Sequence, residues 1–391
     1  MKIEKVNRNI SLLSNSIREE FYPKHTVYFD DDKTKILSWF DPSNNYPEKT
    51  IQEIRTGTTL ESILFEDLIY KTGSAFNAND PAFLKFINED KVNLKGNNFK
   101  YIFKKVNDNI NKLGNSFIEI TTDENGSFIY FDYIQPQKCR LTTDGKVLIY
   151  PDWSNYNKKK AQKLPLYPNL KKFTKQGVVI LKSVFHIKTE ADGFDHYGIN
   201  EKIAEALKLN EKEHRRNNWQ LSQIKKGFKR DFFLVTDFAL NEREKKKSDA
   251  AFAKVSGDDY AGGVENIEGE NGKLVPAEGS YNFDFTKDDT SDQLFLKMGF
   301  PRSLIGIKSG GAFSVEQVES DYDQYLPKVE EQQTFIISEF KSVLDNFKYN
   351  TNDWNVINTP PSIVLQSYMP FMNDEQKAKV IDNKLLKYGI E

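Results

Sequence analysis

Apolar side chains recur every three or four residues along one long stretch toward the C-terminal end of the chain. The stripe consists of Val315, Val318, Tyr322, Tyr325, Val329, Ile336, Phe340, Val343 and Phe347, and Gln333 fills its single gap. This spacing predicts a helix over 314–347 that buries one face. Such a helix would be about 50 Å long at 1.5 Å per residue. Ser314, followed three residues later by Gln317, predicts a capping box at its start.

Two features distinguish this predicted helix. Pro327 lies in its interior, where proline removes a backbone hydrogen bond and clashes with the preceding turn, so we expect a kink there. A loop of small and polar residues leads into the helix, and it contains Lys308, Ser309, Gly310, Gly311, Ala312 and Phe313. A helix of this length is too large for the core of a small domain. The pattern therefore indicates a part of a larger assembly.

The stretch from 60 to 190 alternates between the helical and the extended period. Helical spacing covers 60–70, a short helix beginning at Pro81, and 99–113, which Gly114 ends. Strand-like runs at 116–120, 128–134, 146–150 and 178–188 are accompanied by Asn-Gly and Asp-Gly turn signals. Together these segments predict a mixed α+β body.

Two other segments have weaker patterns. Residues 1–60 show little periodicity, and 39–47 is typical of a turn-rich arm. The three aspartates at 30–32 favour a solvated turn over a metal loop. The lysine-, asparagine- and proline-rich segment at about 155–175 is predicted to be a solvated excursion from the body.

The second half of the chain predicts two helices with a small module between them. A mostly polar helix is expected over 199–226 and a shorter one over 289–299. Between them we expect a strand at 231–238, a helix beginning at 241, an acidic glycine-rich loop at 257–272, and strands at 273–275 and 281–285. After the long helix, a short strand at 362–366 and a helix at 373–388 are predicted.

Composition and charge limit the classes of function. The 55 basic and 57 acidic residues give a net charge of −2, which argues against a protein that grips nucleic acid through a strongly basic face. A near-neutral charge is compatible with a protein that lets DNA slide past without gripping it. Cys139 is the only cysteine, so no intrachain disulfide forms, and we expect a buried thiol. With no signal-peptide or membrane-span pattern, we expect a soluble protein made in the cytoplasm.

Motifs for catalysis are missing from the sequence. Gly306-Ile307-Lys308-Ser309 is a near miss for a phosphate-binding loop, since lysine must follow glycine directly. There is no zinc-protease helix, nucleophile elbow or dinucleotide fingerprint. We therefore expect no enzyme, no cofactor and no metal. One alternative stays open, a metal-dependent nuclease that uses scattered carboxylates such as Asp258 and Asp259.

The order of these parts and several short motifs resemble the portal (head–tail connector) protein of tailed double-stranded DNA bacteriophages. Residues 114–120 are similar to the family's Gly-Asn-aromatic strand. Residues 184–188, followed by Gly198-Ile199, resemble its next strand and helix start. Residues 298–306 resemble the step before the tunnel loop, and 314–317 resemble the start of the long helix. The resemblance covers about 60–390.

The resemblance implies an α+β fold with wing, stem, clip and crown regions that assembles as a ring, generally of twelve subunits. The N-terminal arm and wing would be 1–198, with the long wing helix at 315–349. The stem helices would be 199–227 and 287–306, the clip 228–286, the tunnel loop 307–314, and the C-terminal strand and crown helix 350–391.

The resemblance also implies a location and partners. The ring would occupy one capsid vertex of the virion, contact the major capsid protein, and bind the large terminase and then the head–tail adaptor. Double-stranded DNA would pass through it without sequence preference, and no membrane would be involved. The tunnel loop would line the channel, with Lys308 facing phosphate. An ordinary exposed lysine is an equally good interpretation of Lys308. For the Gly-Gly pair, a plain flexible loop is the alternative and channel lining is favoured.

The expected partner-binding residues of the clip are Asp258, Asp259, Glu265, Glu268 and Glu270. Another ring-forming virion protein, such as an adaptor or baseplate subunit, is an alternative. Such a protein would not explain why a small module is inserted between two helices ahead of a long kinked helix.

Overall fold

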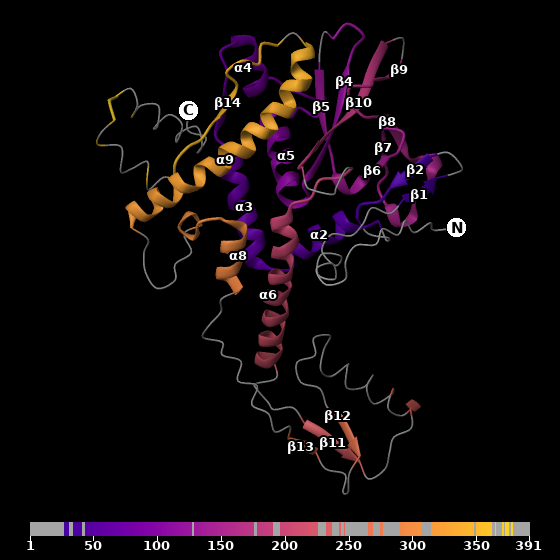
Figure 1. Cartoon of the computed structure of the whole chain (residues 1–391), viewed down its shortest axis with the longest axis vertical. Helices are drawn as coiled ribbons and strands as arrows, with labels where there is room; N and C mark the ends of the chain where they lie inside the picture. Colours follow the sequence, from indigo (N-terminus) through magenta and orange to yellow (C-terminus); the bar gives the residue numbers. More distant parts are fainter. Residues whose placement is uncertain are drawn as a thin grey trace, which may run out of the picture.

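The computed structural model (Figure 1) describes most of the chain outside its two ends and the inserted module. The described residues are 27–30, 34–40, 44–126, 129–175, 178–190, 196–225, 232–236, 242–243, 246, 265–268, 274–276, 290–305, 314–347, 349–361, 364, 370, 372–374 and 377.

The long helix α9 (Val315–Leu344) organises the fold, because it crosses two separate hydrophobic cores. A short 3-10 turn, η5 (Asp345–Phe347), continues it. The predicted stripe is confirmed at most of its positions: Val318, Tyr322, Tyr325, Val329, Gln333, Ile336, Phe340 and Val343 are buried, whereas Val315 and Phe347 are only partly buried. Ile337 and Leu344, outside the predicted stripe, are buried as well. Ser314 caps the helix by accepting a hydrogen bond from the Gln317 amide at 3.2 Å.

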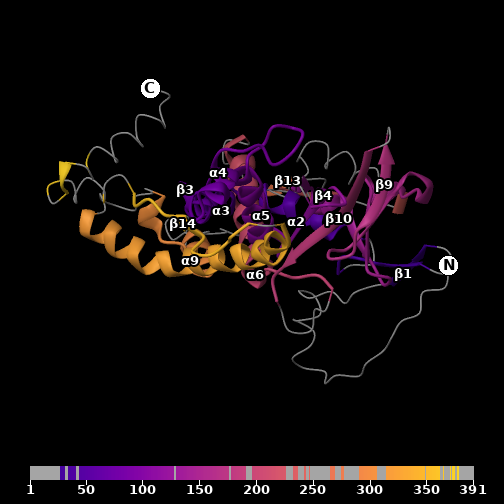
Figure 2. The ribbon, with the colours of Figure 1, turned by 90° about the horizontal axis from the view of Figure 1, so that it is seen from above.

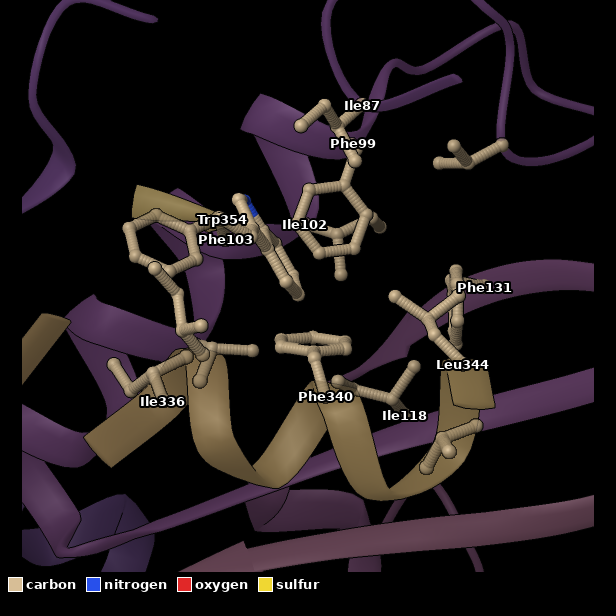
Figure 3. Close-up of a cluster of buried hydrophobic side chains, with 14 of the residues drawn as sticks. Ile87, Phe99, Ile102, Phe103, Ile118, Phe131, Ile336, Phe340, Leu344 and Trp354 are labelled. Atoms are coloured by element: carbon tan, nitrogen blue, oxygen red, sulfur yellow. The ribbon is translucent and has the colours of Figure 1, made fainter. Parts of the chain in front are cut away.

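The C-terminal half of α9 packs into the larger core (Figure 3). Phe340 packs against the rings of Phe99 and Phe131, with ring centroids 4.9 and 5.7 Å away. The other walls come from α4 (Pro81–Asn88), α5 (Phe99–Leu113) and the sheet β5-β4-β10-β9. Its strands are β5 (Ile129–Ile134), β4 (Asn115–Thr122), β10 (Val178–Lys188) and β9 (Lys171–Lys175). A two-stranded ribbon, β3 (Ala75–Asn77) with β14 (Asn355–Ile357), lies beside α9.

The N-terminal half of α9 packs into a second core with four other helical segments. These are α2 (Tyr46–Ile54), α3 (Thr58–Thr72), α6 (Glu201–Lys225) and α8 (Thr290–Met298), and the turn η4 (Arg302–Leu304) closes the core. In Figure 1, α6 leaves this core and extends downward toward a small separate sheet. That sheet has the order β12-β11-β13, formed by β12 (Glu265–Glu268), β11 (Phe232–Thr236) and β13 (Leu274–Pro276).

The remaining sheet packs on a third hydrophobic core. Its order is β1-β2-β6-β7-β8, formed by β1 (Val27–Asp30), β2 (Thr34–Leu37), β6 (Cys139–Thr142), β7 (Lys146–Ile149) and β8 (Gln162–Pro165). Short 3-10 turns flank these strands at η1 (Pro136–Lys138), η2 (Trp153–Asn155) and η3 (Lys158–Lys160). The Cys139 thiol is buried in this core, as predicted. The α+β class is thereby confirmed.

Several sequence expectations were wrong. The turn-rich arm at 39–47 is instead a core segment, because Trp39 and Phe40 are fully buried against Tyr197, and α2 begins at Tyr46. The lysine-rich segment at 155–175 is not an excursion, since β8 pairs with β7 and β9 with β10. In each segment only a few residues are buried or paired with another strand. They are too few to form a periodic pattern in the sequence.

Two corrections concern the second half of the chain. The acidic stretch at 257–272 was predicted to be a loop, yet it contains β12, which pairs in parallel with β11. The predicted strand at 362–366 is described only at Val364, which is helical and buried; the strand of this region is β14, earlier in the chain. The predicted strand at 281–285 lies outside the described residues, as does most of the helix at 373–388. Within the described part of the chain, no helix has the length and apolar character needed to cross a membrane.

Candidate connector site at the start of the long helix

The two flanks of segment 306–313 are tied together by one carboxylate. Asp321, on the second turn of α9, accepts a hydrogen bond from the Ser303 hydroxyl at 2.6 Å and another from the Gln317 side-chain amide at 2.8 Å. Ser303 precedes the segment and Gln317 follows it. Ser303 and the start of α9 are therefore held close together.

The turn η4, which leads into the segment, is anchored to α8 and α9. Arg302 lies over the Phe295 ring, 4.9 Å from its centroid, and pairs with Asp292. Gly299 has a φ of +64°, which ends α8 in a left-handed conformation that glycine adopts without strain. Its carbonyl accepts a hydrogen bond from Lys328 at 3.4 Å. The described part of the predicted step, 298–305, thus packs against both helices.

Phe300 inserts from this step into the second core. Its ring centroid lies 5.0 Å from that of Tyr325 and 6.1 Å from that of Tyr70. Burial raises the pKa of Tyr70 to about 12 and also raises that of Tyr325, whose hydroxyl is hydrogen-bonded to Asp67. Both phenols therefore remain neutral at physiological pH.

A buried polar layer separates the two cores that α9 crosses. Asp67 is 6% exposed and accepts from Lys71 at 2.8 Å and from Asn111 at 2.7 Å, in addition to Tyr325. A buried carboxylate is tolerated because it is paired and hydrogen-bonded on several sides. The layer connects the middle of α9 to both α3 and α5.

Two glutamines of α9 extend this layer. Gln332 donates to Asn111 at 2.9 Å and to Asn107 at 3.0 Å. Gln333 and Asn358 exchange two hydrogen bonds, at 2.8 and 3.0 Å. Gln333 is the residue that fills the gap in the apolar stripe, so the gap marks the boundary between the two cores.

Two of the motifs that carried the portal resemblance, 114–120 and 184–188 with Gly198, meet at one joint between the sheet and α6. Asn115 Oδ1 accepts from the Gly198 amide at 2.9 Å, and Asn115 Nδ2 donates to the Gly198 carbonyl at 2.6 Å. A side chain on Gly198 would lie 2.5 Å from the carbonyl oxygens of Gly114 and Thr189. Asn200 continues the joint by donating to the Asn111 carbonyl at 2.7 Å.

His186 is part of the same joint. Its Nε2 lies 2.9 Å from Asn115 Oδ1, which is an acceptor, so this nitrogen carries the proton. The imidazole stacks on Phe117 with ring centroids 4.3 Å apart. Burial, with a smaller effect from Lys188, lowers the pKa of His186 to about 3. The ring is therefore neutral across the physiological range.

Beside this joint lies a cavity of about 340 Å³. Its lining includes Asp67, Lys71, Glu190, Asn200, Lys202 and Gln332, from the polar layer and the start of α6. Among the described residues no group of three or more histidine, cysteine, aspartate or glutamate side chains is arranged to hold a metal ion.

Most of the site residues predicted from the sequence lie outside the described part of the chain. Lys308, Ser309, Gly310, Gly311, Ala312 and Phe313 lie outside the described residues, as do Asp258, Asp259 and Glu270. Glu265 and Glu268 are the first and last residues of β12. Pro327 lies within α9, which continues as a helix on both sides of it, and the kink stays a prediction.

Sequence reasoning gave no role to Asp67 or Asp321, which are common polar residues within helices. Asn115 and Ser303 lie in the motifs 114–120 and 298–306 that carried the resemblance, although their hydrogen-bond partners were not foreseen. For the polar layer, the available signal was Gln333, a polar residue in an otherwise apolar stripe.

Comparison with known proteins gave matches among solved structures alone. No family model matches the sequence, and no curated protein matches it. A chain in the virion of a native gene transfer agent particle is 13% identical, with a TM-score of 0.47, over 84% of this chain and 92% of that chain. A chain in the neck of a native gene transfer agent particle, computed with C12 symmetry, is 14% identical, with a TM-score of 0.47, over 85% and 93%.

An HK97-family phage portal protein from Corynebacterium diphtheriae is 9% identical, with a TM-score of 0.41, over 81% of this chain and 96% of that chain.

Proposed function

We propose that this chain is the subunit of a phage portal, a ring at one capsid vertex through which double-stranded DNA is packaged and ejected. The observation that carries the proposal is the clasp of Ser303 and Gln317 on Asp321. These bonds hold Ser303, which precedes segment 306–313, against the start of α9, which follows it. We propose that this segment, repeated around a ring, narrows a central channel.

The helices α6 and α8 support a stem that carries a clip. They pack together and are joined by an ion pair between Lys297 and Glu205. The chain leaves the body along α6, forms the small sheet, and returns along α8, so residues 228–286 would project from the ring as its clip. We propose that the clip binds the terminase and later the head–tail adaptor through its acidic residues, among them Glu265 and Glu268.

The ring number and the DNA contact are part of the same proposal. We propose twelve subunits, as the resemblance to the portal family implies. Residues 307–314 would form the tunnel loop, with Lys308 making a sequence-blind contact to phosphate. Glycines at 310 and 311 would let the loop change conformation as DNA passes.

The proposal is tested by the mass and shape of the purified protein. Light scattering is expected to give about 540 kDa, twelve times the 45.3 kDa of one chain. Negative-stain electron microscopy is expected to show rings with a central hole of duplex width. A protein that stays monomeric with capsid or scaffold protein present would contradict the proposal.

Two variants separate the roles of the regions. Deleting 310–313 is expected to leave rings intact while impairing DNA packaging or retention, and loss of the rings would contradict a channel-lining role. Replacing the acidic residues of 257–272 by neutral ones is expected to weaken terminase or adaptor binding in a pull-down. Unchanged binding would contradict the clip assignment.

A further inference from the structure

The charge of the chain is strongly segregated. Residues 146–182 contain nine lysines, no arginine and a single acidic residue, Asp152, which gives this segment a net charge of +8. The rest of the chain has 46 basic and 56 acidic residues and carries −10. The near-neutral total therefore conceals one basic region on an acidic protein.

In the structure, two strands of this basic segment lie next to each other. Its strands β8 and β9 are terminal strands of two different sheets, and the sheets meet at a bridge between Leu166 and Val184. Lys171 on β9 donates to the carbonyl of Lys163 on β8 at 3.4 Å, so the two edges touch. The turn η3 leads into β8, so Lys159 and Lys160 lie at the start of this strand.

An aromatic group holds the preceding turn against the body. Trp153 stacks on Tyr156 with ring centroids 4.9 Å apart and an interplanar angle of 11°. The guanidinium of the fully buried Arg140 lies 4.9 Å from the centroid of Trp153. These contacts fix η2, two residues before the lysine run of η3.

Some lysines of the segment are neutralised and others are not. Lys146 and Lys163 pair with Asp144 at 2.7 and 3.3 Å, Lys172 pairs with Glu124, and Lys182 pairs with Glu119. Lys159, Lys160 and Lys171 are exposed, and none of them has a carboxylate within ion-pair distance in the described part of the chain. We call these three residues the lysine surface.

The register of the strands adds a cost that an anion would relieve. Lys171 lies directly opposite Lys182 in the β9–β10 pair, and like charges at such positions are destabilising. Glu119 compensates Lys182 but leaves Lys171 uncompensated. Binding of a polyanion would offset this repulsion.

We propose that the lysine surface binds the phosphate backbone of double-stranded DNA outside any central channel. Lysine is depleted at protein–protein interfaces, whereas lysine contacts to phosphate are sequence-independent and common. The choice of DNA as the polyanion rests on the proposed portal function. The lysine surface lies across the molecule from α8 and the N-terminal end of α9, as the position of β9 shows (Figures 1 and 2). In a ring with segment 306–313 facing the axis, it would lie on the outer rim.

The test uses a relaxed, covalently closed circular plasmid, because closed duplex cannot be threaded through a preassembled ring. Filter binding between 50 and 200 mM NaCl would compare the wild-type protein with K159E/K160E/K171E. The matched control is K85E/K91E/K104E, which changes the net charge by the same amount. It replaces three exposed lysines on α4, on α5 and in the segment between these helices. Light scattering and thermal unfolding on the same samples would establish assembly state and folding.

Loss of three phosphate contacts makes binding less sensitive to salt. The fourfold salt increase is expected to weaken wild-type and control binding about 40-fold more than binding by K159E/K160E/K171E. Equal salt dependence of all three proteins, or no binding of the circle by the wild type at 50 mM NaCl, would overturn the inference. The same light-scattering data test the proposed function separately, because they show whether the protein assembles into a ring.

Discussion

Ser303 donates a 2.6 Å hydrogen bond to Asp321 across a segment that begins three residues after Ser303. The acceptor lies on α9, which starts on the far side of that segment. This hydrogen bond adds to the contacts of Arg302 and Phe300 that hold η4 beside α8 and α9. Asp321 also accepts from Gln317, one turn earlier on α9, which orients its carboxylate toward Ser303.

Replacing Asp321 by Ala is expected to destabilise the protein by about 1–3 kcal/mol, since two hydrogen bonds to a charged acceptor are lost. Urea unfolding would measure this change. Asp323, exposed on the same helix, provides the control, and D323A is expected to change stability by less than about 0.5 kcal/mol. Equal effects of the two substitutions would contradict the anchoring role of Asp321.

Tyr325→Phe removes the hydroxyl that contacts Asp67 and is expected to cost about 1–2 kcal/mol. Asp67→Ala is expected to cost more, about 3–5 kcal/mol, because it leaves Lys71 largely buried without its carboxylate. Denaturant titration of both variants would establish the order. The exposed Tyr101 serves as the control through Y101F, and a larger loss for Y325F than for D67A would contradict this account of the layer.

His186 makes stability depend on pH. Its pKa in the folded protein is lowered to about 3, whereas an unfolded histidine titrates near 6.5, so below pH 6.5 the unfolded state binds more protons. Stability is therefore expected to fall by about 2 kcal/mol from pH 7 to pH 5 through this group. His186→Gln keeps a donor toward Asn115 but does not titrate. Urea unfolding at the two pH values is expected to show a smaller loss for H186Q, and identical losses would contradict the assignment.

Gly198→Ala is expected to be severely destabilising, because the added carbon would lie 2.5 Å from two backbone oxygens that cannot move independently. Gly145→Ala has open space but a φ of +71°, so it is expected to cost only about 1–2 kcal/mol. Thermal unfolding of both variants would rank them. The reverse ranking would show that the joint between the sheet and α6 can open.

Pro327→Ala tests the predicted bend of α9. Alanine restores the backbone donor and removes the clash with the preceding turn, so the helix axis is expected to be straighter than in the wild type. Structures of the two proteins at the same resolution would measure the angle between the helix halves. An unchanged angle would assign any bend to packing against the two cores.

Local patterns in the sequence predicted the elements whose residues supply their own signal. The stripe of α9 follows from a period of 3.6, and the bounds of α5 and β10 follow from periodic apolar runs with clear end signals. The same reasoning failed for Trp39 and Phe40, since two aromatic residues have no period. It failed for β8 and β9 because both are short, lysine-rich and stabilised by strands elsewhere in the chain.

The sequence by itself determined the order of the parts, the long helix with its cap, and the motifs that resemble portal proteins. Only the tertiary structure decided that Asp321 holds Ser303 beside α9, that Gln333 lies at the boundary of two cores, and that Asn115 meets Gly198. The physical reason is that propensity and periodicity act between near neighbours in the chain. Hydrogen bonds between residues far apart in sequence depend on how the elements pack, which no local pattern records.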